Sequence, residues 1–217
     1  MKKLSTAIIV ILNIGLIIAG ALYLISIFKP QTSIEEDLTL QYLAEISRAK
    51  YESSQLSAHY ADIATQEQRH NTSLLLKAIA KAETIQCKNC SRAIKILGGT
   101  FNLPKQQVFN HLSTHRHLQS IIEHKSALHE KHTAHLIKYT VDRNNMYVAR
   151  LLLWCDASDI HQIKFIQREL SNSNSTLLSQ PRKYYVCPKC SNISDDEFIS
   201  HLCPHCMTPS AEFLVFD

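Results

Sequence analysis

The sequence predicts a mostly α-helical protein, in which a membrane-spanning helix precedes a four-helix bundle and a small metal-binding ribbon follows it. The 217 residues include only 4 glycines and 6 prolines, a composition that suits long helices with few turns. A long apolar run lies near the N-terminus, and two Cys-x-x-Cys motifs lie near the C-terminus. We therefore expect an anchor over residues 1–30, a bundle over 36–171, a linker over 172–183 and a ribbon over 184–217.

The predicted anchor is the almost unbroken apolar run of residues 7–28. At about 1.5 Å per residue, a helix of this length reaches roughly 33 Å and can cross the hydrocarbon core of a bilayer. Lys2 and Lys3 precede the run, so the positive-inside rule places the rest of the chain outside the cytoplasm. A cleaved signal peptide is the alternative, but the run is long for one and no small-x-small site closes it. We expect a single-pass membrane protein with an extracytoplasmic domain.

The first half of the bundle is predicted as a helical hairpin, because residues 38–97 contain no proline or glycine. A polar stretch over residues 65–72 separates two helical patterns, and Gly98-Gly99 ends the second. The apolar positions with helical spacing are Leu43, Ile46, Ala49 and Leu56 in the first helix and Leu75, Ile79, Ala82, Ile94 and Leu97 in the second.

The second half is predicted as another hairpin. Ser113 or Thr114 can cap a third helix that runs to about residue 140. Asn144 or Asn145 then ends it, and a fourth helix continues to about residue 170. Four helices of this length, with one longer crossover, make a four-helix bundle. The net charge of +4 and the lack of interleaved aromatic and basic residues argue against nucleic-acid binding.

The ribbon is predicted from Cys187-Pro-Lys-Cys190 and from Cys203-Pro-His-Cys206, with twelve residues between the two motifs. Two such motifs at this separation can bring four thiolates to one tetrahedral ion, Fe or Zn. The segment is too short to build its own core, so the ion would supply its folding free energy. Two disulfide-like pairs are the alternative. A Cys-Pro-His-Cys redox motif is a further one, but it requires a strand–helix context that the sequence does not predict here.

This tail resembles the rubredoxin-like C-terminal domain of rubrerythrins. An aromatic residue precedes the first motif, and the second motif reads Cys-Pro-x-Cys. The family then ends with a proline and a Glu-x-Phe sequence, and this chain has Pro209 and Glu212-Phe213 there. The family usually has glycine after each second cysteine, where this chain has Ser191 and Met207. Glycine allows a positive φ that points amides at the sulfurs. Its loss is therefore expected to affect a tuned redox iron centre more than a structural zinc.

The predicted bundle resembles the rubrerythrin family as well. Residues 51–90 can be laid along the family's helical hairpin, and residues 117–166 lie along the same hairpin again. The resemblance implies a ferritin-like bundle around a di-iron centre, with Glu ligands from the first helix of each hairpin and Glu-x-x-His from the second. The matching positions here are Ala49 and Glu52, Lys125 and Leu128, Glu83 and Gln86, and Asp159 and Gln162.

These positions are a poor ligand set for two ferrous ions. Both histidines are replaced by glutamine, and Lys125 places an ammonium where a carboxylate should bridge the metals. A di-iron centre is therefore not expected. We expect a metal-free bundle in which Lys125 pairs with Glu52, Glu83 or Asp159. The alternative is a displaced site built from Glu52, Glu83, His132 and Asp159, with His135 nearby.

The three remaining cysteines are predicted to be small core residues. An offset of 76 residues superposes the two hairpins and places Cys87, Cys90 and Cys155 on isoleucines of the other repeat. A redox pair of Cys87 and Cys90 is the alternative. Trp154 and Tyr139 are interpreted as core or interface aromatics.

Two function classes follow. The resemblance implies rubrerythrin-type redox chemistry, in which electrons pass through iron at the four cysteines to reduce peroxide in the bundle. The degenerate ligands favour a catalytically silent module instead, with zinc in the ribbon and a partner-binding role at the membrane surface. Family members often pair their bundles, so the resemblance allows a homodimer. The sequence does not identify the redox or protein partner, and whether the chain is an enzyme stays open.

Overall fold

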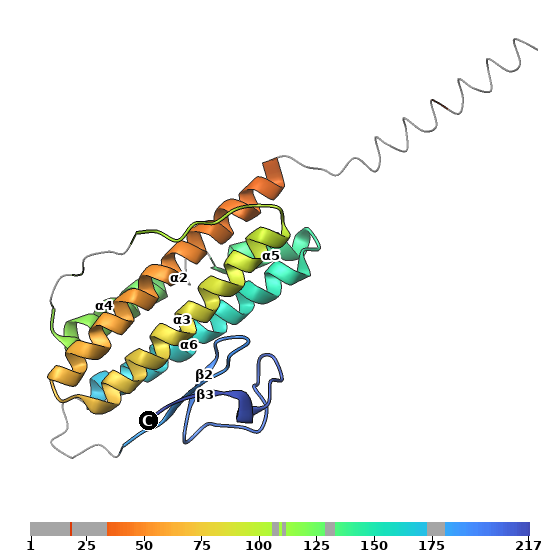
Figure 1. Cartoon of the computed structure of the whole chain (residues 1–217). Helices are drawn as coiled ribbons and strands as arrows, with labels where there is room; N and C mark the ends of the chain where they lie inside the picture. The colour runs from red at the N-terminus through yellow and green to blue at the C-terminus, as the bar shows by residue number, and fades with distance from the viewer. Residues whose placement is uncertain (1–17, 19–33, 106–108, 110–111, 129–132, 173–180) are drawn as a thin grey trace, which may run out of the picture. The chain divides into compact units, whose positions relative to one another are not determined.

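The computed structural model describes residues 18, 34–105, 109, 112–128, 133–172 and 181–217 (Figure 1). Contacts divide the chain into two compact units, Met1–Leu38 and Thr39–Asp217. The predicted membrane span over residues 7–28 lies outside the described residues apart from Ile18. No helix within the described ranges is both long enough and apolar enough to cross a membrane. The span therefore stays a prediction.

The first hairpin consists of α2 (Ile34–Gln66) and α3 (His70–Ile96). The turn between them is shorter than the predicted 65–72, because both helices continue into that polar stretch. Gly98 ends α3 as predicted: its φ is +82°, and the Gly99 amide donates to the Ile94 carbonyl over 2.9 Å. A Cβ on Gly99 would lie 2.8 Å from Cδ2 of Leu40, so a larger residue here would force the Leu40 side chain to shift.

The second hairpin consists of α4 (Thr114–Leu128), α5 (Ala134–Asp142) and α6 (Met146–Asn172). The third predicted helix is thus described as two, on either side of residues 129–132. The prediction of a boundary at the asparagine pair is confirmed. Asn144 has a φ of 56°, and the Asn145 side-chain oxygen accepts the Val148 amide at 3.2 Å, which caps α6.

The core-facing side of α2 differs from the predicted one. Ile46, Ala49 and Leu56 are only half-buried. A stripe of buried residues instead repeats every three or four positions, and most of its members are small or polar. This buried stripe consists of Leu43, Ser47, Lys50, Ser54, Ser57, Ala61 and Ala64.

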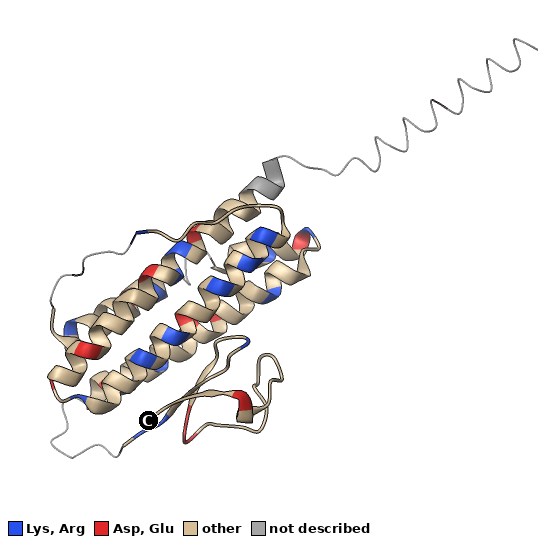
Figure 2. Ribbon diagram, in the orientation of Figure 1, with Lys and Arg blue, Asp and Glu red and all other residues tan. Residues whose placement is uncertain are grey.

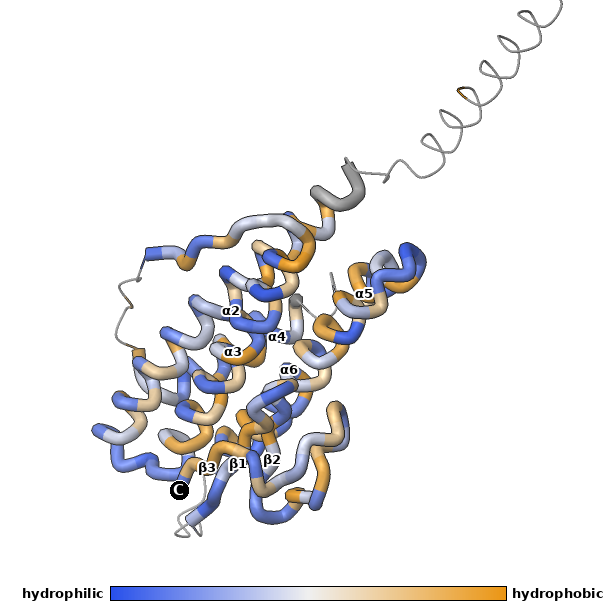
Figure 3. The backbone as a smooth tube through the Cα atoms, turned by 45° about the vertical axis from the view of Figure 1, so that its right-hand side comes forward, coloured by the Kyte–Doolittle hydropathy of each residue, from blue (hydrophilic) through white to orange (hydrophobic). Residues whose placement is uncertain are grey.

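The apolar pattern of α3 agrees better with the structure. Leu75, Ile79, Ala82 and Ile94 are all buried, as predicted, and only Leu97 is half-buried. Figure 3 shows the resulting alternation of hydrophilic and hydrophobic residues along the helices.

The C-terminal ribbon is a three-stranded antiparallel sheet in the order β2-β1-β3, built from β1 (Tyr184–Val186), β2 (Ile193–Asp195) and β3 (Leu214–Phe216). A 3₁₀ turn, η2 (Ser210–Glu212), precedes β3. The sheet packs against α3 and α6, and its buried residues Tyr184, Val186 and Ile193 belong to the main hydrophobic core of the bundle. The ribbon is thus an integral part of this compact unit.

Candidate functional site

The four ribbon cysteines come together as the sequence predicts. Their sulfurs all lie within 4.8 Å of one another, with 3.4 Å between Cys187 and Cys206 and 3.3 Å between Cys190 and Cys203. A tetrahedron with metal–sulfur bonds of about 2.3 Å has edges of roughly 3.8 Å, so a small adjustment accommodates Fe or Zn. Cys206 is partly exposed, whereas the other three are buried. The donor set fits one ion.

Backbone amides surround these sulfurs. Hydrogen bonds from the Cys190 and Cys203 thiols, and then from the amides of Lys189 and Cys190, lower the pKa of Cys187. The hydrogen bond with the Cys187 thiol raises the pKa of Cys203, and the amides of His205 and Cys206, which also point at this sulfur, partly offset the rise. Such amide–sulfur contacts stabilise thiolates and tune a bound metal.

The glycine expectation needs correction at this point. Ser191 and Met207 adopt the left-handed conformation themselves, with φ of 68° and 62°. Their amides donate to the carbonyls of Cys187 at 3.0 Å and Cys203 at 2.9 Å, which closes each motif into a tight turn. The chain therefore keeps the turn geometry without glycine, at the expense of backbone strain.

Ser191 is held in place by the bundle. Its hydroxyl accepts a hydrogen bond from the Gln86 amide at 2.9 Å, and its carbonyl accepts one from the Ser158 hydroxyl at 2.9 Å. Gln162 in turn donates to Ser158 at 3.2 Å. Gln86 and Gln162 are the two positions where the family resemblance implies histidine ligands. In this chain they connect the bundle to the metal ribbon.

We expect opposite effects from introducing glycine at these two strained positions. Met207→Gly should stabilise the ribbon by about 1 kcal/mol, because it relieves left-handed strain and Met207 is 64% exposed. Ser191→Gly relieves similar strain but leaves the buried Gln86 amide without its acceptor, which costs about 1–3 kcal/mol, so the net effect should be a destabilisation of about 1 kcal/mol. Denaturant unfolding followed by Trp154 emission measures both. Two shifts of the same sign would contradict this account.

The centre of the bundle holds a second cluster, the ion quartet of Lys50, Glu83, Lys125 and Asp159, with one residue each from α2, α3, α4 and α6. Lys125 Nζ lies 2.5 Å from Glu83 and 2.7 Å from Asp159. Lys50 Nζ lies 2.5 Å from Asp159 and 3.3 Å from Glu83. The Glu83 side chain is fully buried, and that of Lys125 is 4% exposed.

For Asp159 and Lys50 of the ion quartet, the charges of the partners outweigh desolvation. Burial alone would raise the pKa of Asp159, but Lys125 and Lys50 lower it to about 2. Burial alone would lower the pKa of Lys50, but Asp159 and Glu83 raise it above its ordinary value. Asp159 and Lys50 are therefore both charged near neutral pH, and their charges compensate each other.

This shift predicts a loss of stability in acid. A carboxylate with a depressed pKa stabilises the fold above its unfolded pKa of 3.8, and this contribution disappears as the pH falls through about 2. The shift corresponds to about 2 kcal/mol. We expect the free energy of unfolding to fall by about this amount between pH 4 and pH 2. Asp159→Asn should flatten that slope, and an unchanged slope in urea titrations would contradict the assignment.

The ion quartet does not fit a di-iron centre. Two ammonium groups bind the oxygens of both central carboxylates, and neither ammonium can donate an electron pair to a metal. The predicted Lys125 pairs with Glu83 and Asp159 are present. Sequence reasoning missed Lys50, although it lies on the buried 3–4 stripe of α2.

The other members of the displaced-site prediction that the structure describes are not gathered at this centre. Glu52 is half-buried and has no described contact with the ion quartet, His135 is exposed, and His132 lies outside the described residues. The displaced site thus stays a prediction for which the structure brings together only Glu83 and Asp159.

The three bundle cysteines are buried, as predicted. Burial raises the pKa of Cys87, whose sulfur lies 3.9 Å from the Ser91 hydroxyl. Cys90 shares a hydrogen bond with Cys155 across α3 and α6, which lowers the pKa of Cys90. The thiol that hydrogen-bonds Cys90 is therefore Cys155, and not Cys87 as in the alternative of a Cys87–Cys90 redox pair. Trp154 lies at the interface, where its indole donates to the His205 carbonyl at 3.2 Å.

Comparison with known proteins supports the fold. The fully reduced, all-ferrous state of nigerythrin superposes with a TM-score of 0.75 at 16% sequence identity, over 86% of this chain and 89% of that one. A humanized archaeal ferritin gives 0.54 at 12% identity over 63% and 84%. The bacterioferritin of Desulfovibrio desulfuricans gives 0.51 at 16% identity over 65% and 84%.

No family model and no curated protein matches the sequence. At these identities, the solved structures establish a ferritin-like fold of the nigerythrin type. They do not carry the chemistry of those proteins to this chain, which has to be argued from its own residues.

Proposed function

We propose that this chain is a membrane-anchored protein that binds one ion, Fe or Zn, through Cys187, Cys190, Cys203 and Cys206, and that its bundle works without metal. The observation that carries the proposal is the contrast between two centres in one compact unit. Four convergent thiols form a complete ligand set in the ribbon. Two lysines neutralise the carboxylates of the bundle centre.

With iron bound, the ribbon supplies one-electron redox chemistry. The chain's own residues shape that centre in two ways. Buried amides point at the sulfurs and stabilise the thiolates, and the partial exposure of Cys206 leaves one edge at which electrons can enter or leave. Peroxide reduction inside the bundle has no support from the residues there, so we propose an electron carrier and not a peroxidase.

With zinc bound, the ribbon has a structural role and the chain is an interaction module. The packing of Tyr184, Val186 and Ile193 into the bundle core favours this second candidate. A closed four-thiolate site holds such a ribbon in shape without redox activity. Both candidates have the same single-ion centre. They differ in the metal that it holds, and the metal decides whether the chain is an electron carrier or an interaction module.

Elemental analysis of the purified full chain tests the proposal. We expect one Fe or Zn per chain. A coloured protein that dithionite bleaches identifies the electron carrier, and a colourless protein with one zinc identifies the interaction module. About three irons per chain would overturn the metal-free bundle, and a chain without metal would overturn the four-cysteine site.

Fractionation tests the membrane anchor. We expect the full chain to stay in the membrane pellet after alkaline carbonate extraction, because residues 7–28 provide an apolar run long enough to span a bilayer. Release into the supernatant, with a mature N-terminus near residue 29, would identify a cleaved signal peptide instead.

A further inference from the structure

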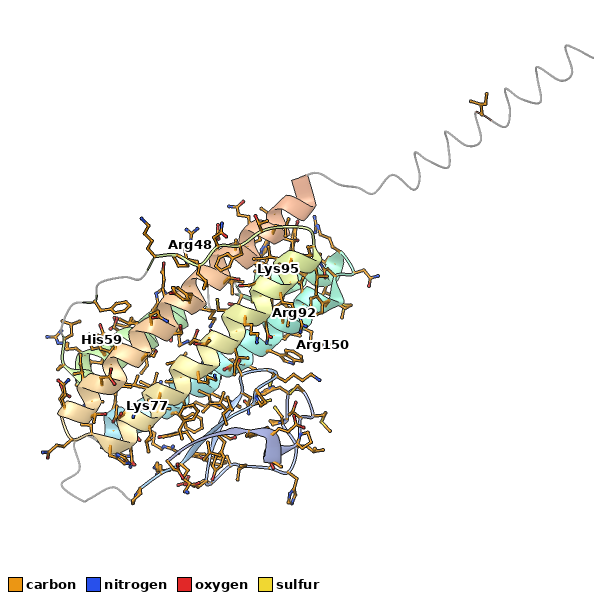
Figure 4. All side chains as sticks on the ribbon, viewed as in Figure 1. Arg48, His59, Lys77, Arg92, Lys95 and Arg150 are labelled. Carbon is orange, nitrogen blue, oxygen red and sulfur yellow. The ribbon has the colours of Figure 1, made fainter. Side chains whose placement is uncertain are left out.

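The solvent-exposed face of α3 carries a continuous row of positive charge. Five basic residues recur at intervals that keep them on one side of the helix, and all five are exposed. From the first to the last, the row is about 27 Å long at 1.5 Å per residue. Figure 2 shows the row in blue, and Figure 4 labels three of its members. We call this row the basic stripe, and it consists of Lys77, Lys81, Lys88, Arg92 and Lys95.

Among the described residues, the basic stripe has no acidic counterpart within the chain. The single acidic residue of α3 is Glu83, which is buried in the ion quartet. Within the described part of the chain, no ion pair involves a residue of the stripe. Like charges four apart, such as Lys77 with Lys81 and Lys88 with Arg92, each destabilise a helix by about 0.2–0.5 kcal/mol. The stripe therefore lowers the stability of the free protein.

The middle of the stripe forms one wall of a groove between α3 and the ribbon. The groove has a volume of about 830 Å³, and Lys81, Lys88 and Arg92 line it from the helix. Lys189 adds a fourth cation from the ribbon, and Glu212 is the one carboxylate in the lining. Asn89 fixes the junction by donating to the Lys189 carbonyl at 2.9 Å.

The groove also reaches the metal site. Cys206, the partly exposed ligand candidate, lines it together with Met207, which is 64% exposed. Pro188 and Leu214 add further apolar surface. A molecule bound here would combine contacts to cations, contacts to apolar side chains and a contact to the open edge of the four-cysteine site.

We propose that this groove and the basic stripe form a docking surface for an acidic segment of a partner protein. Charge complementarity specifies the sign of the partner. The concave shape and the apolar patches suit a protruding polypeptide better than a flat lipid headgroup layer. The residues lining the groove include no aromatic side chain on which a nucleic-acid base could stack. The proposal goes beyond the single-ion function and holds for either metal.

Binding of fluorescently labelled poly-L-glutamate to the full chain in neutral detergent tests this surface. We expect saturable binding that weakens as salt increases. The double charge reversal Lys88→Glu/Arg92→Glu should weaken it at least about tenfold. A matched control, Arg48→Glu/Arg116→Glu, makes the same change in net charge at exposed positions on α2 and α4. It should change the affinity by less than about threefold.

Each other outcome overturns the proposal. Equal weakening in both double variants would show a response to net charge alone. The Lys88→Glu/Arg92→Glu variant could instead bind poly-L-glutamate as the unmodified chain does and yet lose a preference for phosphatidylglycerol over phosphatidylcholine vesicles. That result would identify a membrane contact. Displacement of poly-L-glutamate by duplex DNA at equal charge would identify a nucleic-acid surface.

Elemental analysis of the same samples separates this proposal from the proposed function. An unmodified chain that retains one ion but does not bind poly-L-glutamate counts against the docking surface alone. An absence of metal counts against the four-cysteine site, while the two charge-reversed variants still decide the docking question. As a second readout, bound poly-L-glutamate should slow extraction of the ion by a chelator, because it covers the edge at Cys206.

Discussion

Lys125→Met is expected to lower the free energy of unfolding by about 3–5 kcal/mol, because it leaves the fully buried Glu83 and the partly buried Asp159 with a single cation. Lys125 is 4% exposed and contacts Glu83 and Asp159, at 2.5 and 2.7 Å. Methionine fills most of the lysine volume, so the effect reports lost charge compensation more than a cavity. Urea unfolding of the full chain at neutral pH measures it.

A surface lysine provides the control for this substitution. Lys138→Met breaks an exposed pair with Asp142, in which the lysine side chain is 73% exposed, and should change stability by less than about 0.5 kcal/mol. The double variant Lys125→Met/Glu83→Gln should regain most of the loss, because the 2.5 Å pair of Lys50 and Asp159 remains and charge balance is restored. A double variant as unstable as the single one would refute the role of the ion quartet.

The helices were predictable where the chain carries strong local signals. Gly98 must end α3 because its conformation is left-handed, and the asparagine pair after α5 caps α6 with its own side chain. The register of α2 was not predictable from apolar residues alone. Its buried stripe contains Ser47, Ser54 and Ser57, which are small enough for close helix packing. Counting small residues together with apolar ones would have found that stripe.

The charged residues at the bundle centre were predicted only in part. The resemblance identified Lys125, Glu83 and Asp159 as inward-facing, and the structure brings these three together. Lys50 was missed because the expected inner face of α2 ran through Ala49 and Glu52. A second buried lysine is the natural complement of two carboxylates, so charge balance across the bundle was the available signal.

The ribbon shows the limit of residue-type rules. The absence of glycine after each second cysteine was expected to affect a tuned redox iron centre, because glycine allows the positive φ that points amides at the sulfurs, yet Ser191 and Met207 adopt positive φ themselves. The sequence of the ribbon alone cannot show why, because the support for Ser191 comes from Gln86 and Ser158 on the bundle. Tertiary hydrogen bonds here override a local backbone preference.

Loss of a cysteine ligand is expected to have the largest effect on the ribbon. Cys203→Ser should abolish stoichiometric metal binding and unfold residues 184–217, because a structural four-thiolate ion supplies about 10–16 kcal/mol of apparent folding free energy. The ribbon's own core consists of Cys187, Cys190, Cys203 and Phe213, so the sulfurs and their ion take the place of a hydrophobic interior. Elemental analysis and the emission of Trp154, which contacts His205, measure the loss.

The bundle should survive this substitution, since its helices have hydrophobic clusters of their own around Leu75, Ile79 and Leu152. The helical signal in circular dichroism is therefore expected to stay largely unchanged. Cys87→Ala is the matched control, because Cys87 is buried in α3 outside the four-cysteine site, and this variant should keep one ion per chain. If Cys203→Ser retained its ion and its Trp154 emission, the ribbon would fold on packing against the bundle alone, and the metal would not be what holds it together.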